Sequence, residues 1–326
     1  MEIHCKCGLG CVKKSSATLK DIEDIYKPCV KCFKPKLKKF KPLNHQINLD
    51  KLNANYGRCD CGKRHLDLVM AHALKIMMDH GLRSTEETLR NCCTPLITPA
   101  YPSTSIPYLS ENSVVILTDK IDEKSSIKIV EEVPEIKGVL KGNIKDIVGL
   151  KDANSTPNVY KLLAGCDMRC DVVSTNKGPI CIYRNQAKLH VEFSKPVSPK
   201  IQILEKYLYK YENPKVMDCT CGPGTLGIAS LKFGANKVVF NDIWYPSVEM
   251  TMLNLEVNGF KTEFLNSNKS LVGTGDNFEI YCCDIMELKD FITEKFDLCI
   301  VDTFPGVDTK EFVDAVKHFC NEVVVI

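Results

Sequence analysis

A glycine-rich segment that begins at Asp218 has the residue types of a loop that holds an adenosine-containing ligand. Gly222, Gly224 and Gly227 let the backbone approach a ligand without a clash from a Cβ atom. Asp242 follows the next apolar run, where its carboxylate can accept hydrogen bonds from both ribose hydroxyls. The spacing therefore predicts a nucleoside site between two neighbouring strands.

Two classes of ligand use a loop of this kind. Dinucleotide-binding loops place the first glycine almost directly after the strand, but here Asp218 precedes Gly222 by four residues. The pattern Asp-x-x-x-Gly-x-Gly resembles the first motif of class I S-adenosylmethionine-dependent methyltransferases. That resemblance covers residues 190–326 and implies that Asp218 and the loop face the amino-acid end of the cofactor. A Rossmann domain with a different ligand is the alternative.

Two further acids match the same family in the expected order. Cys283-Asp284 resembles the acidic site near the adenine amino group, and the segment 302–306 resembles the motif that borders the transferred methyl group. The carboxylate of Asp302 suits the orientation of the acceptor or the removal of its proton, and Phe304 suits stacking on a flat substrate, with a core phenylalanine as the alternative. Pro305 completes the candidate catalytic residues. The segment departs from the family pattern at Thr303 and Phe304.

The acceptor is inferred from shorter patterns. Asn241-Asp242, followed by Asn254 and Asn258-Gly259, is similar to a pattern in several RNA base methyltransferases. The segment 302–306 is similar to the Asp-Pro-Phe-Gly region of tRNA guanine N2-dimethyltransferases. These resemblances favour a nucleobase of structured RNA, in tRNA or rRNA, as the acceptor. A small molecule or cofactor precursor is the second hypothesis, and a non-catalytic, metal-dependent binding protein is the third.

Cysteine is unusually frequent, with 18 residues among 326. Cys7-x3-Cys11 and Cys29-x2-Cys32 supply two close thiol pairs, with Cys5 and His4 as substitutes. Four thiolates at such spacing predict a tetrahedral Zn²⁺ site. A reduced, thiol-rich segment or an iron–sulfur cluster is the alternative. A second candidate set comprises Cys59, Cys61, His65, Cys92 and Cys93.

Charge is concentrated in the same N-terminal region. Residues 1–41 hold eleven Lys and four acidic residues, although the whole chain has a net charge of only +2. Lys27–Lys41 contains seven Lys and no acid, and includes Phe33 and Phe40. Lysines interleaved with aromatic residues on a metal-bound loop predict a contact with the RNA phosphate backbone. A solvated surface is the alternative.

The elements that position these residues change in type at residue 196. From there strands alternate with helices, which predicts an α/β, Rossmann-like domain over residues 196–326 with a parallel sheet in the order 3-2-1-4-5. A β-rich middle domain is expected over 113–195, a proline-rich linker over 96–112, and a cysteine-rich, metal-binding head over 1–95. The head includes an amphipathic helix at 66–78. The middle domain has β-rich runs at 114–117, 127–130, 172–173, 180–183 and 189–193.

No strand remains after Ile326 to cover the fifth strand of that sheet. We therefore expect its edge to be covered by a strand from residues 113–193 or by a second subunit, as in a homodimer. No apolar run approaches the roughly 18 residues of a membrane span, so no membrane segment is expected. Met1–Cys11 is too polar and too rich in cysteine for the apolar stretch of an export signal, so none is expected. The chain is predicted to be cytoplasmic, where disulfides are not expected.

Overall fold

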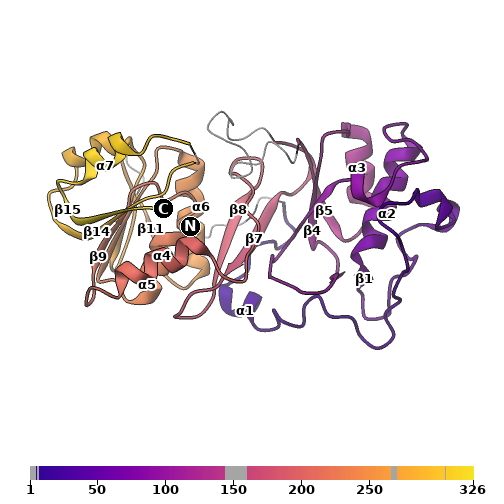
Figure 1. Cartoon of the computed structure of the whole chain (residues 1–326), viewed down its shortest axis with the longest axis horizontal. Helices are drawn as coiled ribbons and strands as arrows, with labels where there is room; N and C mark the ends of the chain where they lie inside the picture. The colour runs from indigo at the N-terminus through magenta and orange to yellow at the C-terminus, as the bar shows by residue number, and fades with distance from the viewer. Residues whose placement is uncertain (1–4, 6, 144–159, 266–269, 305) are drawn as a thin grey trace.

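The computed structural model describes residues 5, 7–143, 160–265, 270–304 and 306–326. The molecule is elongated (Figure 1), with a large sheet near its C-terminal end and a smaller one in its N-terminal half. A two-stranded hairpin, β7 and β8, lies between the two. In the part of the chain that is described, no helix is both long and apolar enough to cross a bilayer.

Five parallel strands form the centre of the large sheet. They are β9 (Lys215–Asp218), β10 (Lys237–Asn241), β13 (Phe278–Tyr281), β14 (Phe296–Val301) and β15 (Cys320–Val325). Their spatial order is β13-β10-β9-β14-β15, which confirms the predicted order 3-2-1-4-5. The carboxyl ends of parallel strands meet at one edge, so the loops that follow β9, β10, β13 and β14 gather there.

Helices cover both faces of this sheet because its strands are apolar on both sides. The helices are α4 (Pro199–Leu208), α5 (Thr225–Phe233), α6 (Tyr245–Val257) and α7 (Lys310–Val316). Along β10, Val238 and Phe240 pack into the core on one face, whereas Val239 packs into the core on the other. The same alternation separates Val216 from Met217 in β9. The β-α alternation along the sequence therefore produces a three-layer domain.

A hairpin that we did not predict extends the sheet beyond β13. β11 (Glu263–Phe264) and β12 (Leu271–Gly275) are antiparallel, and β12 pairs with β13. At the opposite edge β15 pairs only with β14 within the described ranges. The expectation that a strand of 113–193 covers β15 is wrong for the residues described there, because those strands pair among themselves or with β2. A second subunit at this edge stays a prediction.

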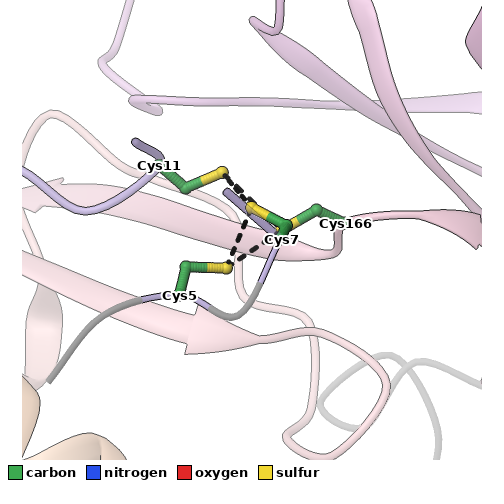
Figure 2. A group of neighbouring side chains, drawn as sticks. All are labelled: Cys5, Cys7, Cys11 and Cys166. Atoms are coloured by element: carbon green, nitrogen blue, oxygen red, sulfur yellow. Dashed lines mark hydrogen bonds between the residues drawn. The ribbon is translucent and has the colours of Figure 1, made fainter. Parts of the chain in front are cut away.

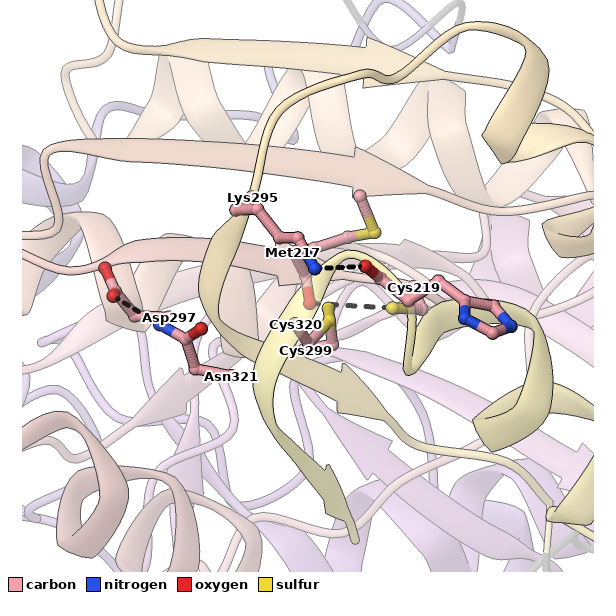
Figure 3. Close-up of a disulfide and its surroundings, with 8 residues drawn as sticks. Met217, Cys219, Lys295, Asp297, Cys299, Cys320 and Asn321 are labelled. Atoms are coloured by element: carbon pink, nitrogen blue, oxygen red, sulfur yellow. Dashed lines mark hydrogen bonds between the residues drawn. A yellow bond between two sulfur atoms is a disulfide. The ribbon is translucent and has the colours of Figure 1, made fainter.

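One pair of cysteines contradicts the expectation of a chain without disulfides. Cys299 of β14 and Cys320 of β15 form a disulfide (Figure 3). Around it, Asn321 donates a hydrogen bond to Asp297, with 3.2 Å between Nδ2 and Oδ1. The two cysteines are 21 residues apart in sequence, and only the pairing of β14 with β15 brings them together. The other sixteen cysteines are free thiols.

The central hairpin is attached to the large sheet by α6. β7 (Met168–Val173) and β8 (Ile180–Asn185) pair along their whole length and share a core with Met250 and Leu253 of α6. The Asn254 side chain accepts a hydrogen bond from the Tyr183 N–H at 2.7 Å and donates one to the Tyr183 carbonyl at 3.0 Å. Asn258 pairs in the same way with both backbone groups of Cys181. Asn254 of α6 and Asn258 at the C-cap of that helix thus replace a neighbouring strand along β8.

The N-terminal half is built on a second sheet. Its strands are β2 (Thr94–Ile97), β4 (Val114–Thr118), β5 (Ile136–Lys141) and β6 (Lys161–Gly165), in the order β2-β4-β5-β6. α2 (Leu66–Asp79) and α3 (Glu123–Glu132) pack on it, and the core that they share draws residues from Tyr26 to Val139. From Tyr26 onward, the predicted cysteine-rich head and this sheet therefore share one core.

Local predictions in this half had mixed outcomes. The predicted helix at 66–78 is confirmed by α2. The predicted strand at 127–130 is wrong: it lies in α3, where Asp122 caps the helix by accepting a hydrogen bond from the Ser125 N–H at 2.8 Å. Residues 189–193 are not a strand either. The domain boundaries at 95/96, 112/113 and 195/196 stay predictions.

The short N-terminal elements connect these units. α1 (Ser15–Leu19) contacts β8, and β1 (Arg64–His65) pairs with β3 (Tyr108–Leu109) just before α2 begins. Four 3-10 helices are described, η1 (Leu43–His45), η2 (Leu49–Lys51), η3 (Leu89–Asn91) and η5 (Ile285–Asp290). η1 and η2 follow the basic segment along the chain, and η3 contacts it, because the Arg90 N–H donates to the Lys39 carbonyl at 3.1 Å. η5 follows β13 at the carboxyl edge of the large sheet.

Candidate active site

The glycine loop connects β9 to α5, and its glycines have different roles. Gly224 has φ +82°, and a Cβ there would lie 2.9 Å from the Thr251 side chain. A Cβ at Gly227 would lie 2.1 Å from the Phe240 ring, so this glycine lets α5 pack closely on β10. Gly222, with φ +53°, faces open space. Of the three predicted glycines, Gly222 therefore lies on the open side of the loop.

Hydrogen bonds from two sides hold this loop in place. Beneath it, the buried carboxylate of Asp218 accepts a hydrogen bond from the Gly227 N–H at 2.8 Å. From α6, Thr251 donates to the Gly222 carbonyl and Asn254 donates to the Pro223 carbonyl, both at 2.9 Å. The loop is thus preorganised by side chains that lie outside it.

Asp218 is unusual because it is almost fully buried. Burial raises the pKa of its carboxyl group to about 7, and the charges of Asp302 and Asp242 add to this rise. Its Oδ1 atom is buried without a hydrogen-bond partner among the described residues. A buried oxygen without a partner is costly, so this atom is available to a ligand group or a water molecule.

Asp242 lies directly after β10, beside the loop. Its Oδ2 accepts a hydrogen bond from the Gly222 N–H at 2.9 Å, and its Oδ1 accepts one from the Trp244 N–H at 2.8 Å. Burial raises the pKa of this carboxyl group, although the two backbone N–H groups oppose the rise. A carboxylate has about four acceptor positions, so both oxygens can still accept hydrogen bonds from ribose hydroxyls.

Asp284 follows β13 and begins the 3-10 helix η5. Its side chain caps that helix by accepting a hydrogen bond from the Met286 N–H at 3.0 Å. The side chain of Met286 is exposed beside it, as are Ile243 and Trp244 after β10. Exposed apolar side chains near the ends of two adjacent strands provide a surface on which a flat ring can lie.

Asp302 follows β14 and is tied to two other segments. Lys200, near the start of α4, approaches its carboxylate oxygens at 2.6 and 2.8 Å. The Thr220 hydroxyl, from the glycine loop, bonds to both the N–H and the carbonyl of Asp302 at 2.9 Å. Burial raises the pKa of the Asp302 carboxyl group, and the Lys200 ammonium opposes that rise. Lys200 was not predicted as a site residue.

Two more polar residues reach this edge from the segment after β8. The rings of His190 and Phe304 meet edge to face, with 5.5 Å between centroids. The His190 Nε2 atom lies 3.0 Å from the Glu192 carboxylate. His190 and Glu192 flank the buried Val191, so they lie on the same side of an extended segment. In the sequence, only this alternation of polar and apolar residues pointed to His190 and Glu192, and it covers too few residues to identify a site.

Glu192 connects this pair to a buried ionic network. Its carboxylate accepts a hydrogen bond from Arg184 at 2.6 Å, and Arg184 also donates to Asp171 at 2.6 Å. Burial alone would raise the pKa of Glu192, but the Arg184 and His190 side chains outweigh it and hold that pKa well below its usual range. Arg169 is also paired with Asp171, at 2.8 Å. Glu192 is therefore a permanent carboxylate beside His190.

The structure brings most of the predicted cofactor and catalytic residues to one edge of the sheet. Asp242 and Asp302 both act electrostatically on Asp218, which lies under the loop. Phe304 is exposed at the same edge, against His190. Pro305 lies outside the described residues.

The predicted metal ligands are not brought together as one set. Cys7 and Cys11 gather with Cys5 and Cys166, whereas Cys29 and Cys32 gather with Cys59 and Cys61. The chain between the two pairs explains the separation. Leu19 and Ile22 pack beside the central hairpin, and Tyr26 already belongs to the core of the N-terminal sheet.

The second candidate set is also redistributed. Cys59 and Cys61 join Cys29 and Cys32, but His65 instead caps α2 by accepting a hydrogen bond from the Asp67 N–H at 3.1 Å. Cys92 and Cys93 contact each other, with 3.3 Å between their sulfur atoms.

Comparisons with known proteins agree with the fold of the C-terminal domain. Residues 199–294 match the family model described as ribosomal protein L11 methyltransferase (PrmA). The ribosomal protein L11 methyltransferase of Shewanella piezotolerans is 43% identical over 53 residues, which is 16% of this chain and 18% of that protein. The ribosomal RNA large subunit methyltransferase I of Photobacterium profundum is 35% identical over 95 residues, 27% of this chain and 24% of that one.

Among solved structures, the tRNA m1G37 methyltransferase of M. jannaschii is 19% identical with a TM-score of 0.39; the match covers 70% of this chain and 57% of that one. The chain spans about a fifth of the length of the curated L11 methyltransferases that it matches. The strand order, the glycine loop with its acids, and the family model together define the C-terminal domain as a class I S-adenosylmethionine-dependent methyltransferase fold.

Proposed function

We propose that this chain is an S-adenosylmethionine-dependent methyltransferase that modifies a nucleobase of structured RNA, in tRNA or rRNA. The observation that carries the proposal is the edge where the glycine loop and Asp242 adjoin a second group of polar residues, His190, Lys200 and Asp302. The first group fits the cofactor, and the second fits an acceptor. Methyltransferases that act on RNA and on protein both occur among the similar proteins.

The loop fits S-adenosylmethionine in three respects. Gly222 leaves open space beside its Cα atom, the buried Asp218 Oδ1 lacks a partner among the described residues, and Asp242 can accept from ribose hydroxyls. We propose that Asp218, Gly222 and Gly224 face the amino-acid end, and that Asp284 lies near the adenine. Gly227 contributes by packing α5 on β10.

Methyl transfer is an in-line displacement, so the protein mainly positions the two reactants. The cofactor supplies an electrophilic methyl group on a sulfonium. We propose that Asp302 accepts a hydrogen bond from an N–H of the acceptor base, and that Phe304 stacks against that base. His190 would take the proton that the acceptor nitrogen loses, and the Glu192 carboxylate would stabilise the resulting imidazolium. Pro305 stays a predicted site residue.

The N-terminal region offers a surface for RNA. Lys34, Lys36 and Lys38 are exposed along the basic segment 27–41, and Phe40 is exposed next to Arg90, whose guanidinium lies 4.9 Å from the ring centroid. Exposed cations interleaved with aromatic rings suit a backbone with unstacked bases. The first half of this segment contains Cys29 and Cys32.

We propose that Cys29, Cys32, Cys59 and Cys61 hold one Zn²⁺ ion, a set that keeps only Cys29 and Cys32 of the predicted ligands. The distance between sulfur atoms is 3.5 Å for Cys29–Cys59 and 3.6 Å for both Cys29–Cys32 and Cys32–Cys61. Four thiolates around one Zn²⁺ ion lie about 3.8 Å from each other, which follows from the usual Zn–S bond of about 2.3 Å. The ion would fix the geometry of the basic segment. The cytoplasmic location and the homodimer stay predictions.

The experiment that tests the function uses the full chain and radiolabelled S-adenosylmethionine. Separate fractions of total RNA, ribosomal proteins and small metabolites are offered as acceptors, with Asp302→Ala as the inactive control. We expect label in RNA, and on a base after digestion to nucleosides. Label confined to protein would show that the acceptor is a protein, as the name of the L11 methyltransferases states for those relatives. Label confined to metabolites would favour the small-molecule hypothesis.

A further inference from the structure

Four cysteines from distant parts of the chain meet beside the central hairpin (Figure 2). Cys5, Cys7 and Cys11 come from the N-terminal segment, and Cys166 comes from the turn between β6 and β7. Their sulfur atoms point toward one another and form a closed set of short contacts. The distances are 3.2 Å for Cys5–Cys7, 3.3 Å for Cys7–Cys11, 3.6 Å for Cys11–Cys166 and 3.3 Å for Cys5–Cys166.

The size of this set fits one metal ion. All four sulfur atoms lie within 4.8 Å of one another. A single tetrahedral ion with bonds of about 2.3 Å places thiolates about 3.8 Å apart, which is close to these distances. An iron–sulfur cluster inserts several iron atoms between its thiolates, and so requires a much wider set. Thiolate ligands select soft or borderline ions such as Zn²⁺.

The surroundings supply what a set of thiolates needs. Four thiolates and one divalent ion carry a net charge of −2, and the Lys137 ammonium lies 3.2 Å from the Cys11 sulfur. Backbone N–H groups of Leu9 and Met168 donate to the sulfur atoms of Cys7 and Cys166, both at 3.4 Å. Such donors orient metal ligands and stabilise their charge.

The backbone holds Cys166 in position before any ion binds. The Cys166 N–H donates to the Lys137 carbonyl at 2.7 Å. A Cβ at Gly138 would lie 2.2 Å from the Cys166 carbonyl oxygen, and a Cβ at Gly165 would lie 2.1 Å from the Lys137 carbonyl oxygen. Only glycine at both positions allows β5 and the β6–β7 turn to approach this closely. Cys166 is thereby set against the N-terminal segment.

We propose that Cys5, Cys7, Cys11 and Cys166 bind one Zn²⁺ ion, separate from the site formed by Cys29, Cys32, Cys59 and Cys61. The ion fastens the N-terminal segment to the hairpin that α6 connects to the cofactor loop. From the segment, the Lys13 N–H donates to the Tyr183 hydroxyl at 3.0 Å. Asn254 then bonds to the Tyr183 backbone and to the Pro223 carbonyl of the loop.

The test counts metal ions in the full-length protein, purified under reducing conditions, by inductively coupled plasma mass spectrometry. We expect two zinc ions per chain in the native protein and one in either Cys166→Ser or Cys29→Ser. The matched control is Cys170→Ser, because Cys170 is buried in the same core but lies outside both clusters; it should retain two ions. Two ions retained in Cys166→Ser would overturn the proposal.

A second measurement covers the case in which Cys166→Ser does not fold. The native chain is reconstituted with Co²⁺, whose visible spectrum reports tetrahedral thiolate ligands, and is compared with Cys5→Ser and Cys29→Ser. Each variant is expected to lose half of the thiolate-to-cobalt absorption. Iron with acid-labile sulfide, or a disulfide among these four cysteines in the chain as purified under reducing conditions, would overturn the proposal. Neither measurement depends on methyl transfer, so its outcome is distinguishable from that of the proposed function.

Discussion

The carboxyl edge of the large sheet and the two cysteine clusters are assembled in opposite ways. At the sheet edge, only the glycine loop, α5, a short turn and β10 separate Asp218 from Asp242. Asp242 accepts a hydrogen bond from Gly222 of that loop, and Asp218 accepts one from Gly227 in the first turn of α5. In the cluster of Cys5, Cys7, Cys11 and Cys166, Cys11 and Cys166 are separated by 155 residues and by the whole N-terminal sheet. The first region is encoded by local order along the chain, and the second by the tertiary fold.

Because the regions are assembled separately, we expect each to have its own function, and mutations can test this. Changes at the sheet edge are expected to alter catalysis or cofactor binding without affecting metal content. Changes in the basic segment are expected to alter RNA binding without affecting the cofactor. The predictions below run from the largest expected effect to the smallest, and any cross-effect between the regions would weaken the comparison.

The largest effect is expected at His190. Replacement of His190 by Ala removes the proposed proton acceptor and should lower kcat about 10²–10⁴-fold. The KM for S-adenosylmethionine should change little, because His190 contacts Phe304 and Glu192 rather than the glycine loop. Single-turnover kinetics with labelled cofactor measures the effect.

The control for this prediction is Glu192→Gln, which keeps a hydrogen-bond acceptor for His190 but removes the charge. It should cause a smaller loss of kcat than His190→Ala and shift the pH profile of the reaction. A kcat within threefold of the native value in His190→Ala would show that the base lies elsewhere, with Asp302 as the next candidate.

The second prediction concerns Asp242, a proposed cofactor-binding residue at the sheet edge. Asp242→Ala should raise the dissociation constant of S-adenosylmethionine at least tenfold, because each charge-assisted hydrogen bond to a ribose hydroxyl contributes about 1.5–3 kcal/mol. The same change removes the acceptors of the Gly222 and Trp244 N–H groups, so the loop itself should loosen. Isothermal titration calorimetry measures the constant.

Asp242→Asn is the matched variant, since it keeps one oxygen acceptor and should lose less affinity. Metal content should remain native in both variants. An unchanged dissociation constant in Asp242→Ala would remove Asp242 from the cofactor site.

Much of the sheet edge could be predicted from sequence, for reasons that its residues make clear. Asp218, Gly222, Gly224 and Asp242 lie in a β-α-β unit, whose geometry places residues at fixed spacing at one edge. Lys200, His190 and Glu192 could not be found in this way. They lie before that unit, and only the packing of α4 and the central hairpin brings them to Phe304 and Asp302.

The cysteines show where local reasoning fails. Spacing correctly identified Cys7 with Cys11 and Cys29 with Cys32 as close pairs. Two residues only three or four positions apart are joined by a single turn of chain, so their side chains can meet. It could not show that the pairs separate, since that depends on where residues 12–28 pack. Cys166 gave no signal, and neither did the disulfide between Cys299 and Cys320.

Mutations in the basic segment 27–41 should affect RNA binding and leave cofactor binding unchanged. Replacing Lys34, Lys36 and Lys38 by Gln should weaken RNA binding and reduce the slope of log affinity against log salt by about 2, at about 0.7 per phosphate contact on single strands. Affinity for S-adenosylmethionine should stay unchanged. Filter binding at several salt concentrations measures the slope.

Lys39→Gln serves as the control, because the Lys39 ammonium is already near the carboxylate of Asp67, at 3.6 Å. It should change the slope less than any of the other three. A triple variant with the native slope would place the RNA surface elsewhere on the molecule.

The smallest effect concerns the buried Asp218 carboxyl group and the pH dependence of stability. Burial raises the pKa of Asp218 to about 7 in the folded chain, above the ordinary value of about 3.9 in the unfolded chain. Between those values the folded chain holds a proton that the unfolded chain has lost, so stability falls as pH rises through this window. The slope is at most about 1.4 kcal/mol per pH unit.

Asp218→Asn should remove this contribution while keeping an oxygen that accepts from the Gly227 N–H. The unfolding free energy of the variant, relative to the native chain, should therefore increase between pH 5 and pH 7. Because Asp242, Asp302 and Lys200 also face this group, Asp302→Asn is measured in parallel to separate their contributions. Urea unfolding followed by the fluorescence of Trp244, the single tryptophan, measures the difference. A constant difference across this range would mean that Asp218 is ionised in the folded chain and that another charge beneath the loop offsets its burial.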